Sequence, residues 1–127
     1  MDISQQAPQS APLSAKYELF VGRFVDGELK SPMLAGFAVQ FEGEAHYVVR
    51  LTMFPATPYY LSKNRDSQTS YTIFAKMVKD NATGTVRFQN PIGSGKLLSD
   101  AKSHLEIRFP LLGTSVFMNL FSRTSRE

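Results

Sequence analysis

The chain has 127 residues, of which 43% are hydrophobic, 12% are aromatic and none is cysteine. This length suits one domain with a real core, and the lack of cysteine excludes disulfides, thiolate metal sites and cysteine nucleophiles. No apolar run approaches the ~20 residues of a membrane-spanning helix, and the N-terminus shows no secretory signal pattern. We therefore expect a cytoplasmic protein without a membrane span.

The net charge of +3 is unevenly distributed along the chain. Residues 1–58 carry four cations and six anions, whereas residues 59–127 carry ten cations and five anions. Such asymmetry predicts an electropositive region and a polyanionic partner. The alternative is a mildly basic surface that serves solubility.

Three parts follow one another in the predicted organisation. Residues 1–15 are rich in Gln, Pro, Ser and Ala and have no aromatic residue, which predicts a disordered N-terminal tail. Residues 16–122 form the predicted folded domain, and residues 123–127 a frayed C-terminus.

Strand patterns begin directly after the predicted tail. The first strand is expected within residues 16–25, where apolar residues occur on both sides. In residues 35–41, Phe37 and Val39 alternate with smaller residues. In residues 46–54, Tyr47, Val49 and Leu51 alternate with polar ones. Because a short Gly43 turn separates these two alternating runs, they predict a hairpin.

The second half of the chain continues this pattern after an irregular stretch. Residues 55–70 contain two prolines and many polar residues, which predicts a loop with at most a short edge strand at 59–62. Further strands are expected at residues 71–78, 85–89, 102–112 and 115–121, with turns at 80–84, 91–95 and Gly113. The whole pattern predicts an all-β fold: a single antiparallel β-sandwich or small β-barrel of about seven to nine short strands.

Catalytic and cofactor motifs are absent from the sequence. The stretch Gly93-Ser94-Gly95-Lys96 lacks the earlier glycine and the following Ser or Thr of a phosphate-binding loop, and instead predicts a turn with an exposed lysine. His46 and His104 are expected on the solvent side of their strands, and no spacing brings them to a metal. We expect no enzymatic activity, no cofactor and no metal.

The best candidate site combines basic and aromatic residues around the irregular stretch. Thr72, Phe74 and Lys76 share one side of their predicted strand. Aromatic rings between cations suit single-stranded nucleic acid, because rings stack on bases and cations follow phosphates. The predicted nucleic-acid-binding residues are Arg50, Tyr59, Tyr60, Lys63, Arg65, Tyr71, Phe74, Lys76 and Arg87.

Three alternatives remain open at this level. The aromatic residues can instead close one end of the fold, with no role in binding. Strands with apolar residues on both sides favour a structural or assembly subunit of a larger viral or secretion-related complex, as a homo-oligomer or with a partner protein. A barrel can also carry a small ligand in its interior.

Overall fold

Strands make up most of the protein in the computed structural model, which describes residues 14–98, 103–121 and 123–124. These residues form nine strands and no helix. The strands are β1 (Ser14–Val25), β2 (Glu28–Phe41), β3 (Tyr47–Leu51), β4 (Phe54–Lys63), β5 (Ser70–Lys79), β6 (Val86–Leu97), β7 (His104–Phe109), β8 (Thr114–Asn119) and β9 (Arg123–Thr124). The predicted all-β class is confirmed.

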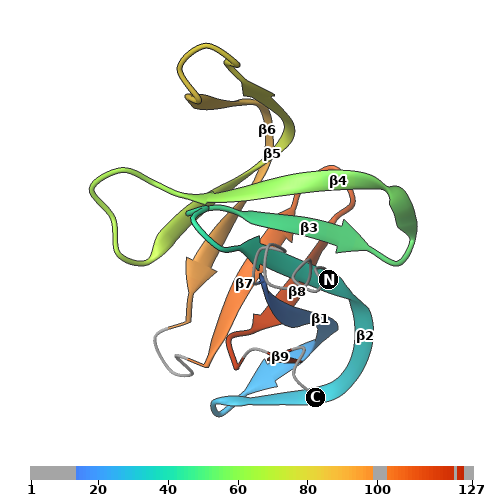
Figure 1. Ribbon diagram of the computed structural model, residues 1–127. Helices are drawn as coiled ribbons and strands as arrows, with labels where there is room; N and C mark the ends of the chain where they lie inside the picture. The colour runs from blue at the N-terminus through green and yellow to red at the C-terminus, as the bar shows by residue number, and fades with distance from the viewer. Residues whose placement is uncertain (1–13, 99–102, 122, 125–127) are drawn as a thin grey trace, which may run out of the picture.

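Each strand from β1 to β7 pairs antiparallel with the strand that follows it, and β8 returns to pair with β1. Eight strands therefore close into a ring, a small barrel, and β9 adds a short ladder to β1 (Figure 1). The closing joint is short, with Leu19 opposite Met118 and Phe20 opposite Phe117. Closure removes most of the free strand edges that would otherwise pair with other chains.

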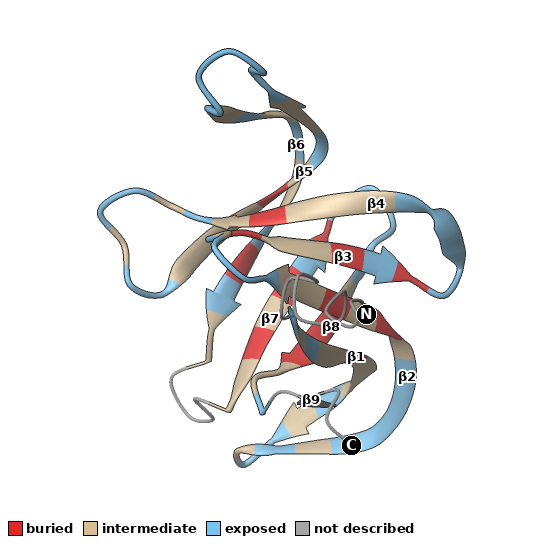
Figure 2. Ribbon diagram, viewed as in Figure 1, coloured by how far each residue is buried: buried red, intermediate tan, exposed pale blue. Residues whose placement is uncertain are grey.

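Large apolar side chains fill the barrel interior, because every second residue of a strand points inward. Figure 2 shows these buried positions on strands around the ring. The largest fully buried side chains are Leu19, Val49, Leu61, Ile73, Leu105, Ile107 and Met118. Because they pack the interior as a core, the fold argues against an internal ligand cavity.

Strand β2 turns its small residues inward and its large residues outward. Gly36 and Ala38 are buried, while Phe37 and Val39 alternate with them on the outer wall. A Cβ at Gly36 would collide with the carbonyl oxygen of Arg50 on β3. The close approach of β2 and β3 thus requires a small inner side, and it leaves an aromatic ring on the outside.

The predicted irregular stretch between residues 55 and 70 is wrong for its first half. Strand β4 covers Phe54–Lys63 and pairs with both β3 and β5. It tolerates prolines because its ladder with β5 begins only at Tyr60, so that Pro55 and Pro58 lie where β4 has a free edge.

The predicted turn at residues 91–95 is also wrong, because these residues lie inside β6. Gly93 pairs with Ile73 of the neighbouring strand. A Cβ at Gly93 would collide with the carbonyl oxygen of Arg108 on β7. The glycine therefore serves close packing between strands and not a change of chain direction.

The predicted ends of the domain can be compared with the strands only in part. Ser14 and Ala15 belong to β1, and residues 123–124 form β9 beside it. The predicted tail and frayed end otherwise fall on residues 1–13 and 125–127, which lie outside the described residues. The predicted domain boundaries therefore stay a prediction.

Candidate functional site

Three of the predicted site residues point outward from neighbouring strands. Arg50 lies on β3, and Tyr60 of β4 is directly opposite Phe74 of β5. Tyr60 stands two residues beyond Pro58, the ladder partner of Arg50, so Tyr60 and Arg50 are diagonal neighbours. The residues next to the three point inward and are fully buried: Val49, Leu61 and Ile73. The alternation of each strand therefore places the three on one outer wall.

Four rings gather on this wall and form the outer aromatic cluster: His46, Tyr60, Phe74 and Phe88. The Phe88 ring centroid lies 5.2 Å from that of His46, 5.4 Å from Phe74 and 6.3 Å from Tyr60. Phe74 and Phe88 are stacked with an angle of 24° between their planes. Because Tyr60, Phe74 and Phe88 are only half-buried, each ring keeps a part that a flat partner can contact.

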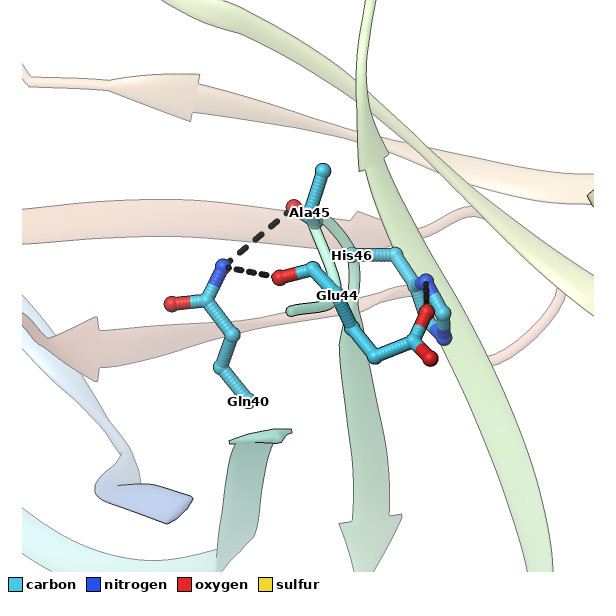
Figure 3. A network of polar contacts seen from close by, with 4 residues as sticks. All are labelled: Gln40, Glu44, Ala45 and His46. Carbon is cyan, nitrogen blue, oxygen red and sulfur yellow. Dashed lines mark hydrogen bonds and ion pairs between the residues drawn. The ribbon is translucent and has the colours of Figure 1, made fainter. Parts of the chain in front are cut away.

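The turn between β2 and β3 supports the fourth ring of the cluster. Gln40 donates from Nε2 to the carbonyl oxygens of Glu44 at 3.1 Å and Ala45 at 3.4 Å (Figure 3). Oε1 of Glu44 lies 3.6 Å from Nδ1 of His46. The predicted solvent-facing position of His46 is wrong, because His46 is only 8% exposed and the Phe88 ring packs against it.

A fifth outward ring, Phe37 of β2, lies between two exposed cations. The Lys16 ammonium stands 4.2 Å from the Phe37 ring centroid, a distance that gives a cation–π contact. On the other side Phe37 pairs directly with Arg50, whose Nη1 donates to the carbonyl oxygen of Pro55 at 3.2 Å. We call Lys16, Phe37, Arg50 and the outer aromatic cluster together the basic aromatic face.

The β5–β6 hairpin continues beyond the barrel as an arm, residues 75–89, which projects past β4 (Figure 1). The ladder places Lys76 and Arg87 on one side of the arm and Phe88 on the other. A register shift after Ile73 and the positive φ of 62° at Asn90 mark where the arm leaves the barrel. Through Phe88 the arm packs onto the aromatic cluster, while its two exposed cations face away from Phe88.

Tyr59 and Tyr71, also predicted for the site, belong to the inner side of the barrel. The Tyr59 ring packs edge-on against Phe109 of the core, with 6.1 Å between centroids. Tyr71 packs against the core as well, and burial raises the pKa of its phenol. Burial, followed by the charges of Tyr71 and Tyr17, raises the pKa of the nearby Tyr47 to about 12. These rings fill the interior and do not join the basic aromatic face.

Lys63 is the last residue of β4 and pairs with Tyr71, three positions along the β4–β5 ladder from Tyr60, and Arg65 lies in the loop that follows. Nζ of Lys63 donates to the carbonyl oxygen of Ser67 at 2.7 Å, which ties this lysine to its own loop. Arg65 is exposed. The predicted set is thus divided between the outer wall, the arm, the interior and this loop.

A groove of about 680 Å³ lies elsewhere, between β1 and the β7–β8 hairpin. Its lining includes Val21, Gly22, Phe117 and Arg108, whose Nε donates to Glu106 at 3.3 Å. None of the nine predicted site residues lines this groove. Because its arginine is paired with a carboxylate and it holds no ring cluster flanked by cations, it is a poorer match to a polyanion.

Four residues of the basic aromatic face were missed by the sequence reasoning: Lys16, Phe37, His46 and Phe88. The alternation of residues 35–41 was a usable signal for Phe37, since one of its two sides had to face outward. No comparable signal exists for Phe88, whose contacts depend on the bend at the base of the arm.

No protein-family model, curated protein or solved structure matches this chain. In the part of the chain that the structure describes, no group of three or more His, Asp or Glu side chains is placed to hold a metal ion. Residues 14–98, 103–121 and 123–124 also contain no helix that is long and apolar enough to cross a membrane.

Proposed function

We propose that this protein is a non-enzymatic module that binds single-stranded nucleic acid on its basic aromatic face. The observation that carries the proposal is the group of partly buried rings on the outer wall, flanked by the exposed cations Lys16 and Arg50. A base that stacks on such a ring gains ~1–3 kcal/mol, and lysine or arginine beside the ring attracts the adjoining phosphate. An exposed ring that contacts only water gains less free energy than one that stacks on a base.

The order of strands supports a path for the nucleic acid across the wall. Lys16, Phe37 and Arg50 come from β1, β2 and β3, and the cluster with its arm follows on β4, β5 and β6. At ~4.8 Å between neighbouring strands, β2 to β5 span roughly 15 Å. That distance accommodates about four nucleotides at the ~3.4 Å rise of a stacked strand.

Stacking on these rings requires unpaired bases. In a duplex the faces of the bases are covered by their neighbours, so the rings have nothing to stack on, and only the phosphates can meet the cations. The proposal therefore specifies a single strand, with affinity that depends on both salt and aromatic rings.

The direct test is a fluorescence-anisotropy titration of labelled oligothymidine at low and near-physiological salt, beside a duplex of the same length. We expect saturable binding of the single strand that weakens with salt and exceeds binding of the duplex. Tyr60→Ala should weaken binding by roughly five- to 150-fold, which corresponds to ~1–3 kcal/mol.

The matched control for Tyr60→Ala is Phe121→Ala, because Phe121 is a 71% exposed aromatic residue outside the basic aromatic face. Circular dichroism should show an intact fold for both variants, and the affinity of Phe121→Ala should equal that of the natural chain. Equal affinity for single strand and duplex, or an unaffected Tyr60→Ala variant, contradicts the proposal.

A further inference from the structure

One end of the barrel exposes large apolar side chains from two turns. Met53 and Phe54, at the β3–β4 turn, are 81% and 40% exposed, and Leu111 and Leu112, at the β7–β8 turn, are 86% and 50% exposed. We call these four residues the apolar end. The exposed Met33 and Leu34 of β2 border it, because the neighbouring residues Ala35 and Thr52 are joined by a 2.8 Å backbone hydrogen bond.

The two turns belong to one continuous surface. Phe54, Leu111 and Leu112 all line a hollow of about 150 Å³. Its remaining lining residues are Tyr59, Ile92 and Phe109. An apolar cavity of about 150 Å³ can hold a benzene ring, so this hollow can take a leucine or methionine side chain.

The segments that build the apolar end carry no charge. Residues 31–35, 51–55 and 109–113 contain no Asp, Glu, Lys or Arg, and Lys30, Arg50 and Arg108 directly precede them. The chain as a whole carries a net charge of +3. Two copies of a cationic chain repel each other least where they meet through an uncharged surface.

We infer that the apolar end is the site where a second copy of this chain docks. The surface is self-complementary, since projecting apolar side chains, Met53 and Leu111, flank or line an apolar hollow. In a two-fold pair the same patch meets itself, so a projecting side chain of each copy enters the hollow of the other. The four patch residues include no lysine or arginine, which disfavours an anionic membrane surface or a nucleic acid as the partner of this patch.

The four residues of the apolar end are not part of the basic aromatic face, although Arg50 of that face donates to the carbonyl oxygen of Pro55 beside Phe54. Dimerisation and nucleic-acid binding are measured separately, so the inference can fail while the proposed function holds. Exposed apolar patches of more than a few hundred Å² are unusual on proteins that act as monomers, and the centres of interfaces are depleted of charged residues. The apolar end shows the second property, because its four residues carry no charge. A pair formed in this way leaves the arm and the outer rings of each copy uncovered.

Sedimentation velocity of the full chain over a range of micromolar concentrations tests the inference. We expect a monomer–dimer equilibrium, and Leu111→Asp or Met53→Asp should raise the dimer dissociation constant at least about tenfold, because each places a charge in an apolar contact. Phe121→Asp is the matched control, since it adds the same charge at an exposed aromatic residue elsewhere and should leave the equilibrium unchanged.

Circular dichroism of each variant distinguishes loss of dimerisation from loss of folding. Because Met53→Asp and Leu111→Asp change different turns, one variant still tests dimerisation if the other unfolds. A chain that stays monomeric at high concentration overturns the inference. A dimer that Leu111→Asp and Met53→Asp do not weaken overturns it too, as does a dimer that Phe121→Asp weakens equally.

Discussion

The basic aromatic face and the apolar end both expose large side chains to water, but their charges differ. Exposed Lys16 and Arg50 flank the rings of the face, and Lys76 and Arg87 stand on the arm beside it. No charged residue occurs in the segments of the apolar end. Rings between cations suit a partner with flat groups and negative charge, whereas apolar side chains alone suit another apolar surface.

Both regions depend on the same barrel, so the largest expected effect comes from breaking the barrel itself. In Gly93→Ala the added methyl group meets the carbonyl oxygen of Arg108 and the side chain of Ile73. Since backbone atoms cannot move aside cheaply, we expect the free energy of unfolding to fall by roughly 3 kcal/mol. Urea denaturation followed by circular dichroism measures this.

Ser94→Ala is the control for Gly93→Ala, because Ser94 is exposed on the same strand and its truncation creates no clash. It should change the free energy of unfolding by less than about 0.5 kcal/mol. A Gly93→Ala protein as stable as the natural chain would show that β6 and β7 leave room for a methyl group at this position.

The cations of the basic aromatic face give the next largest effect, and they distinguish a local site from net charge. Lys16→Gln with Arg50→Gln should weaken oligonucleotide binding and lower the slope of log affinity against log salt by about 1.4, at ~0.7 per lost phosphate contact. The control, Lys30→Gln with Arg108→Gln, removes the same charge at two residues paired with Glu28 and Glu106. Equal losses of affinity in both double variants would mean that binding depends on the net charge of the protein and not on these two residues.

The separation of the two regions predicts a smaller effect still. Leu111→Asp should leave affinity for an oligonucleotide of one site length within about twofold of the natural chain, because Leu111 lies outside the basic aromatic face. Lys16→Gln, which keeps the contact of Arg50 with the β3–β4 turn, should in turn dimerise like the natural chain. Anisotropy and sedimentation velocity on the same samples check both, and a joint loss in either variant would mean that the two regions are coupled.

Much of the fold could be predicted because alternation and turn residues are local signals. The hairpin around Gly43 and the turn at Gly113 follow from them. The extent of β4 could not be predicted, since Pro55 and Pro58 are tolerated only by a free edge that depends on where β5 begins. The sequence assigns Gly93 to a turn, because the atom that leaves no room for a side chain there, the carbonyl oxygen of Arg108, belongs to another strand.

The site was harder to predict because the register of β2 against β3 decides which side faces out. In the structure Phe37 pairs with Arg50. A three-residue turn centred on Gly43 would instead pair Phe37 with Val49, and a shift of one residue moves every side chain of a strand to the other side. Alternation alone therefore finds an aromatic row but not the side of the barrel that it occupies.

The smallest predicted effect lies at His104 on β7, outside both regions, where pH should change stability without changing either surface. The His104 ring packs against Phe24 with 5.0 Å between centroids, and burial lowers its pKa below the ordinary value of 6.5. The unfolded chain then binds the proton more readily, so the free energy of unfolding should decrease as pH falls from 6.5 towards the folded pKa, and no further below it. Comparing urea midpoints at pH 7.5 and 5.5 for the natural chain and His104→Gln isolates this effect, because His46 is present in both. We expect the urea midpoint of His104→Gln to fall less on acidification than that of the natural chain. A variant that keeps the full pH dependence would assign the pH dependence to another group.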